Sequence, residues 1–177
     1  MVITQSNLKN GIEEALSGWR RIVVLGVGNE LGGDDALGLS AAKKLKEALA
    51  EIPNVEVLAT GNAPENFTGL LRRLSPSHIL LIDAAEIGGK AGTIKLIKDH
   101  EIEETMPSTH SLPLYLLINY LKKELGSEMI VLGIQPKMLS FGTTISSEVE
   151  CSLDELVLLF KEVLGNSLEA MTQGYRS

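Results

Sequence analysis

The stretch that decides the fold is residues 21–38, RIVVLGVGNELGGDDALG. An apolar run, 22–27, enters a glycine-rich turn, and Asp34 and Asp35 follow at the start of the next expected helix. In dinucleotide-binding proteins, a strand and turn of this kind place a phosphate at the helix N-terminus. Here that position carries two carboxylates, which the partial positive charge of a helix N-terminus stabilises. The pattern therefore favours a cation over a phosphate as the ligand of this loop.

The glycine spacing also departs from that of nucleotide-binding domains. Gly26, Gly28 and Gly32 form GxGxxxG rather than GxGxxG. Such domains also carry an acidic residue at the end of the second strand, where it binds the ribose. The second apolar run of this chain ends instead in Ala59 and Thr60. A dinucleotide-binding domain is therefore the weaker alternative.

Composition narrows the class of protein. With 177 residues, 44% hydrophobic and 4% aromatic, the chain is predicted to form one globular domain with an aliphatic core. Its net charge of -7, without a run of like charges, argues against a nucleic-acid surface. The single cysteine, Cys151, excludes an internal disulfide and suits a reducing cytoplasm. No signal peptide and no apolar run near the roughly 18 residues of a membrane span is visible. We expect a soluble, cytoplasmic protein that is not inserted in a membrane.

Five apolar runs are expected to form strands, and the segments between them helices. Most of these runs are continuous rather than alternating, as in strands buried on both faces of a sheet. The expected strands are 22–27, 55–60, 79–83, 93–97 and 129–134. The expected helices are 5–18, 37–49, 64–74, 112–125 and a last one from about 147 that Gly165 closes.

This order predicts an α/β fold, a three-layer α/β/α sandwich with a mostly parallel five-stranded sheet. The segment between residues 83 and 93 is too short for a crossover helix, so these two strands are expected to pair antiparallel. The domain is expected to span residues 1–177, with its core at about 21–164. Residues 1–20 would form an N-terminal extension and 166–177 a flexible tail.

Three side chains are the candidates for chemistry. Asp35, Asp83 and His110 lie on segments that this architecture brings to one sheet edge, beyond the carboxyl ends of the strands. Two carboxylates and an imidazole suit a divalent first-row metal and leave coordination positions open. Plainer alternatives stay open: an aspartate that caps a helix, a structural Asp83, and a capping or core role for His110.

Other catalytic arrangements have little support. The chain has no GxSxG turn, and Cys151 falls within the last expected helix, where a packing role is the simplest interpretation. His78 and His100 are expected on the surface, and Glu30 and Glu86 are expected to be solvated.

Several motifs, in one order, resemble those of the nickel–iron hydrogenase maturation endopeptidases. They are GVGNELGGDDALG at 26–38, GNAPEN at 61–66, LLIDAAEIG at 80–88, STHSLPLYLLINYL at 108–121 and LGIQP at 132–136. The resemblance covers roughly residues 21–164 and is strongest to the branch that serves formate-hydrogenlyase-type hydrogenases.

The resemblance implies a specific proteolysis. Enzymes of this family remove a short C-terminal extension from the hydrogenase large subunit after nickel insertion. The family's metal-site positions, which are also the candidate catalytic positions, map onto Asp35, Asp83 and His110. Asp35 is glutamate in some relatives, and TGNAPEN at 60–66 replaces a glycine-glycine-threonine sequence of others. Asp34 is a weaker candidate for a general base.

The implied enzyme is a metal-gated, aspartic-type endopeptidase. Its partner would be the nickel-loaded large-subunit precursor, which supplies the nickel, and no organic cofactor or nucleic acid is implied. A monomer is expected because trimming the tail of a folded partner needs access rather than symmetry. The alternative is a nickel-checking chaperone that binds the same subunit without cutting it.

Overall fold

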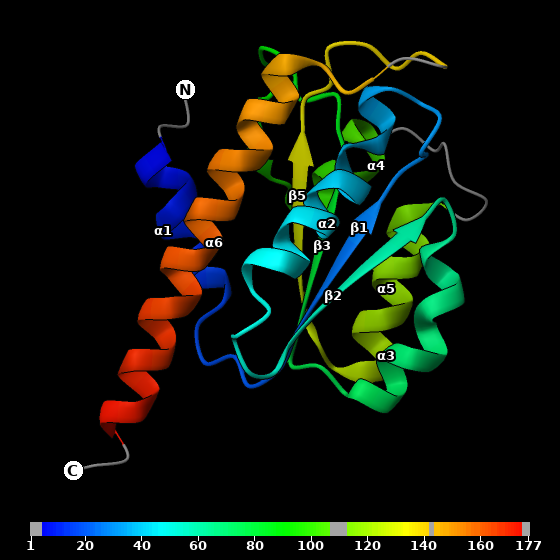
Figure 1. Ribbon diagram of the computed structural model, residues 1–177. Coiled ribbons are helices and arrows are strands. Elements are labelled where there is room, and N and C mark those ends of the chain that lie inside the picture. The colour runs from blue at the N-terminus through cyan, green and yellow to red at the C-terminus, as the bar shows by residue number, and fades with distance from the viewer. Residues whose placement is uncertain (1–4, 107–112, 142–143, 175–177) are drawn as a thin grey trace.

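The computed structural model describes residues 5–106, 113–141 and 144–174. Within them, a five-stranded sheet is covered by helices on both faces (Figure 1). Its strands are β1 (Ile22–Val27), β2 (Val55–Gly61), β3 (His78–Ala84), β4 (Ile94–Leu96) and β5 (Glu128–Ile134). The order is β2-β1-β3-β5-β4, and β4 alone runs antiparallel to its neighbour. The predicted α/β sandwich with one antiparallel strand is confirmed.

The helices form two layers, each with its own apolar cluster. On one face lie α1 (Gln5–Ala15), α2 (Leu37–Ala48) and α6 (Ser147–Gly174), and on the other α3 (Thr68–Leu74), α4 (Ile102–Thr105) and α5 (Leu114–Leu125). Three short 3-10 turns precede α2, α3 and α4: η1 (Asp34–Ala36), η2 (Pro64–Phe67) and η3 (Asp99–Glu101). Even-numbered residues of β1 and β3 face the first layer and odd-numbered ones the second, as strand alternation requires.

The partner expected for the antiparallel strand is wrong. β4 pairs with β5, Ile94 opposite Ile134 and Leu96 opposite Leu132, and not with β3. The edge of β3 is taken by β5, which pairs with it in parallel along its whole length. The connection from β3 passes the end of β5, where the Gly92 N–H donates to the Gln135 carbonyl at 2.8 Å. The longer apolar run thus takes the central place, and the three-residue strand takes the edge.

The expected end of the last helix at Gly165 is also wrong, because α6 continues to Gly174. A glycine ends a helix when it takes the left-handed conformation, as Gly126 does with φ 64° after α5. Gly165 has no positive φ, and Val163 and Leu164 before it are buried in the core. Packing therefore carries the helix past this glycine.

His78 was expected on the surface, and the structure corrects this. It is the first residue of β3 and is buried, with Nδ1 3.0 Å from the Ser77 hydroxyl. Burial disfavours the charged imidazolium and lowers the pKa of His78 below its ordinary value. His100 is exposed, as predicted.

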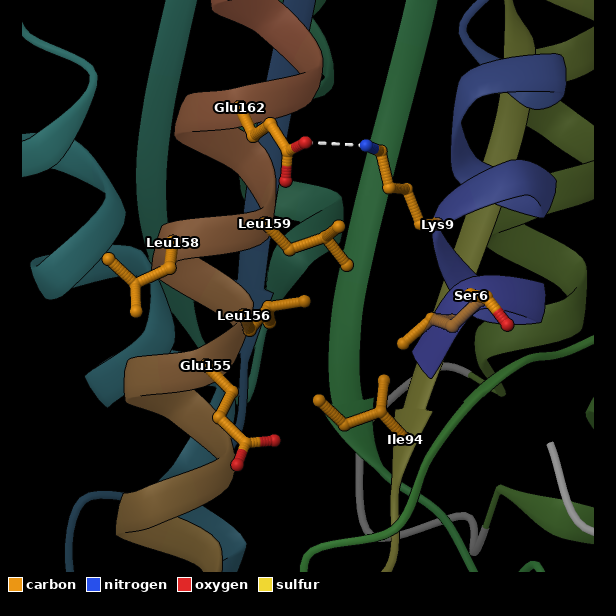
Figure 2. A pocket seen from close by; sticks show the side chains of 9 residues that line it. Ser6, Lys9, Ile94, Glu155, Leu156, Leu158, Leu159 and Glu162 are labelled. Atoms are coloured by element: carbon orange, nitrogen blue, oxygen red, sulfur yellow. Dashed lines mark hydrogen bonds and ion pairs between the residues drawn. The ribbon is translucent and has the colours of Figure 1, made fainter. Parts of the chain in front are cut away.

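A shallow groove of about 320 Å³ runs between α1, α6 and β4 (Figure 2). Its lining is mostly aliphatic, including Ile94, Leu156 and Leu159. Lys9 and Glu162 approach across it to 2.5 Å and neutralise each other. Neither Asp35 nor Asp83 lines this groove.

Candidate active site

The strand order singles out the carboxyl ends of β1 and β3, where an open α/β sheet forms its ligand crevice. From β1 the chain crosses to β2 on one side and then to β3 on the other side of β1, which makes this the point where the strand order reverses. Open α/β sheets bind their ligands at such a point, beyond the carboxyl ends of the strands. Asp83 lies at that end of β3, and Asp35 lies in η1, which follows β1 and contacts β3.

Asp83 is a buried carboxylate, with 3% of its surface exposed. Its Oδ1 accepts the N–H of Ala84 at 2.8 Å, which fixes the side chain at the strand end. By alternation it lies on the same face of the sheet as Ile79 and Leu81, which pack with residues of α5. The sequence motif THSLPL leads into that helix, so Asp83 faces the side of the sheet where the chain returns after residue 112.

Asp35 is 9% exposed, and its backbone closes the loop after β1. Its N–H donates to the Gly32 carbonyl at 3.0 Å, and its carbonyl accepts the Asn29 N–H at 2.9 Å. The carboxylate packs over Gly32: a Cβ built there would lie 2.6 Å from the Asp35 Cβ and 3.1 Å from its Oδ2. Glycine at this position therefore leaves the room that the carboxylate occupies.

The other glycines of the motif serve packing between β1 and α2. A Cβ on Gly26 would lie 2.0 Å from the Gly38 carbonyl oxygen, and one on Gly38 would lie 2.0 Å from that of Val27. Both distances are far below van der Waals contact, and the clashing atoms belong to the backbone. The glycines therefore let α2 approach the strand closely, which brings the two aspartates to the sheet edge.

Asp34 has a role that the sequence did not indicate. Its carboxylate is buried and makes no side-chain hydrogen bond that caps the helix. It accepts the N–H groups of Lys137 (2.7 Å), Met138 (3.3 Å) and Ser146 (2.7 Å), and the Ser146 hydroxyl at 2.9 Å. Asp34 thus ties the connection between β5 and α6 to the loop after β1, and we refer to these four bonds as the Asp34 latch.

Gln135, in the GIQP segment, organises the loop that follows Asp83. Its side chain is buried, accepts the Ile87 N–H at 2.9 Å and donates to the Glu86 carboxylate at 3.0 Å. Glu86 is exposed, as expected, and its own N–H donates to the Thr105 carbonyl. A lone glutamine after a strand carries no spacing signal, so only the motif resemblance pointed to it.

His110 lies outside the described residues, and its part in the site stays a prediction. Among the residues that the structure describes, no three His, Cys, Asp or Glu side chains are placed to hold a metal ion. The described carboxylates therefore do not form such a group by themselves. The described helices include none that is long and apolar enough to cross a membrane.

Comparison with known proteins decides the family. A family model described as hydrogenase maturation protease matches residues 39–162, a range that includes Asp83 and begins just after Asp35. The chain belongs to the hydrogenase maturation protease family. This membership confirms the predicted resemblance and makes the chain a member of a family of proteolytic enzymes.

Relatives and solved structures agree with this family. The chain is 40% identical over 163 residues to a putative hydrogenase maturation protease of Methanocaldococcus jannaschii, covering 89% of this chain and 96% of the relative. It is 42% identical over 120 residues to the hydrogenase 3 maturation protease of Escherichia coli, covering 67% and 75%. A [NiFe] hydrogenase maturation protease from Thermococcus kodakarensis superposes with a TM-score of 0.79 at 32% identity, covering 88% of this chain and 99% of that one.

Proposed function

We propose that this protein is a nickel-gated endopeptidase that removes the C-terminal extension of a nickel–iron hydrogenase large-subunit precursor. Asp35, Asp83 and His110 are the proposed metal-site and catalytic residues. Family membership supports the protease activity, and the names of the relatives support a hydrogenase as the substrate. We further propose that it acts in the cytoplasm as a monomer.

The observation that carries this proposal is the pair of buried aspartates at the crevice between β1 and β3. Asp83 is anchored by the Ala84 N–H and Asp35 by the turn that packs it over Gly32. Carboxylates held in place in a crevice can accept a proton from a water that lies within hydrogen-bond reach and attacks the substrate. They can also donate oxygen ligands to a divalent metal.

The nickel in this scheme belongs to the substrate. Cysteine thiolates of the precursor are softer ligands than carboxylate oxygen or imidazole nitrogen, so they would hold most of the metal. Bound there, nickel supplies Lewis acidity near the scissile peptide. Asp35, Asp83 and His110 would add a completing contact that holds the cleavage segment still. A precursor without nickel lacks this anchor, which explains why trimming would follow metal insertion.

The deciding experiment measures the intact mass of the large-subunit precursor after incubation with the protein, with and without nickel loading. We expect loss of a C-terminal peptide only in the nickel-loaded sample. Cleavage of both samples would remove the metal gate from the proposal. An unchanged mass in a sample shown to be nickel-loaded would instead favour a chaperone that binds without cutting.

Matched variants test the site. Asp83→Asn retains an oxygen that can accept the Ala84 N–H, so the fold should survive while cleavage falls at least 100-fold. His110→Ala should abolish processing in the same assay. The control is Asp154→Asn, since Asp154 is an exposed aspartate of α6 that pairs with Lys44. Normal processing by Asp83→Asn or His110→Ala would refute the assignment of that residue.

A further inference from the structure

Four exposed apolar side chains gather on the two loops that the Asp34 latch joins. Leu31 is 64% exposed in the loop after β1, and Met138, Leu139 and Phe141 are 59%, 39% and 79% exposed in the connection from β5 to α6. We call these four residues the apolar rim. They make up more than half of the large apolar side chains that are exposed in the described part of the chain. Apolar side chains concentrated in this way on a soluble protein mark an interaction surface.

The apolar rim is displayed on a fixed backbone. Asp34 holds the N–H groups of Lys137, Met138 and Ser146, and a backbone bridge joins Gly33 to Leu139. A buried carboxylate that is satisfied by four hydrogen bonds keeps both loops in one relative position. The rim can therefore receive a partner without first paying the entropy of ordering a free loop.

The rim adjoins the candidate active site. Leu31 lies in the same loop as Asp35, and Figure 1 shows this loop and the β5–α6 connection side by side at the carboxyl edge of the sheet. A cavity of about 470 Å³ extends from Leu31 along Asn29 to Thr60 and Gly61 at the end of β2. A chain bound near Asp35 would thus have the apolar side chain of Leu31 within the same loop.

The charges around the rim select the kind of partner. Lys137 is the only charged residue among 135–141, and its ammonium binds the Glu148 carboxylate at 2.7 Å. Residues 135–141 consequently present no uncompensated charge, while the exposed Glu30 beside Leu31 adds a negative charge that disfavours an anionic partner. An exposed aromatic side chain alone can bury on the order of 150 Å². The surface fits a segment with large aliphatic or aromatic side chains.

We propose that the apolar rim binds apolar side chains of the hydrogenase large-subunit precursor next to the cleavage position and thereby sets substrate specificity. The proposal rests on the proposed function, because the precursor is the substance that has to cross this edge. The catalytic groups would cut, and the rim would hold the chain beside the cut. Substrate affinity should then depend on Met138 and Phe141, which are not among the catalytic residues assigned above.

The test is a double variant, Met138→Ser with Phe141→Ser, assayed for cleavage of the nickel-loaded precursor and for binding to it. Both side chains are exposed, so the melting temperature should stay that of the wild type. We expect kcat/KM to fall at least tenfold, through KM, with kcat within about twofold. The matched control is Leu158→Ser, a leucine of α6 that is 67% exposed and outside the rim, and it should cleave normally.

The two readouts separate this proposal from the proposed function. If the double variant cleaves the precursor with the KM and affinity of the wild type, the rim is not a docking surface. The proposed protease activity would be unaffected by that result. If the wild type binds the precursor without cutting it, the protease proposal fails, and weaker binding by the double variant still supports the rim. A fall in kcat at constant KM, or an equal loss in Leu158→Ser, would overturn the rim as a docking surface.

Discussion

Replacing Asp34 with asparagine tests whether one buried carboxylate holds the β5–α6 connection against the loop after β1. Asparagine has nearly the same shape but offers one acceptor oxygen and a donor –NH2 in place of two acceptors. In the wild type, Oδ2 accepts from Lys137, Met138 and the Ser146 hydroxyl, and Oδ1 accepts from the Ser146 N–H. Whichever way the amide turns, at least one backbone N–H then faces another donor.

The size of the effect follows from these bonds. A buried N–H without an acceptor costs about 1–3 kcal/mol. The bonds that survive change from charge-assisted to neutral, and neutral bonds are roughly half as strong. Together we expect the latch to weaken by about 3 kcal/mol, which corresponds to about a 100-fold change in an opening equilibrium. Because the connection can detach without unfolding the sheet, the loss should appear there first.

Amide hydrogen exchange measures this opening directly. In Asp34→Asn the amides of Lys137, Met138 and Ser146 should exchange about 100-fold faster than in the wild type. Amides in the buried strand β3 should change less. Asp154→Asn serves as the control. Asp154 pairs with Lys44 but stays largely exposed, and such surface pairs contribute about 0–1 kcal/mol to stability. Exchange at the three amides within about threefold of the wild type would refute the latch.

Two further predictions concern the fold. Gly38→Ala should destabilise the protein by about 3 kcal/mol or more in urea unfolding, because its Cβ would meet backbone at 2.0 Å. Gly69→Ala, where a Cβ meets nothing within 4 Å in α3, should be neutral or stabilise by up to about 1 kcal/mol, and an equal loss in both variants would contradict the packing argument. The lowered pKa of His78 means that, below its ordinary value of 6.5, the unfolded chain binds a proton that the folded protein excludes. Stability should therefore fall as pH falls through 6.5, and His78→Asn should remove part of that dependence while His100→Asn should not. A pH dependence identical in His78→Asn and the wild type would show that this histidine contributes nothing to it.

Local pattern predicted much of the fold. The run at 22–27 matches β1 at both ends, and Gly126 ends α5 in the left-handed conformation that a C-terminal glycine favours. The short segment after β3 correctly indicated an antiparallel strand. These features depend on residues within a few positions of each other, so sequence periodicity and backbone preference suffice to predict them.

The candidate site, too, was predicted in part from the sequence and in part only from the structure. The sequence placed Asp35 shortly after one strand and Asp83 at the end of another, and the sheet order then put those strands next to each other. The family motifs supplied the proteolytic activity, which the residue types alone left open. The predicted third residue, His110, lies outside the described residues, so the complete set stays a prediction for the cleavage assay.

Only the tertiary structure showed which groups far apart in the chain would meet. Asp34 binds residues more than 100 positions away, β5 rather than β4 takes the edge of β3, and His78 is buried at the start of its strand. No spacing rule encodes such pairs, because they depend on how whole elements compete for one core and one sheet edge. By itself the sequence determined the elements, their order and the candidate carboxylates. Packing decided that Asp34 holds the two loops together, since a buried charged group needs partners, wherever in the chain they come from.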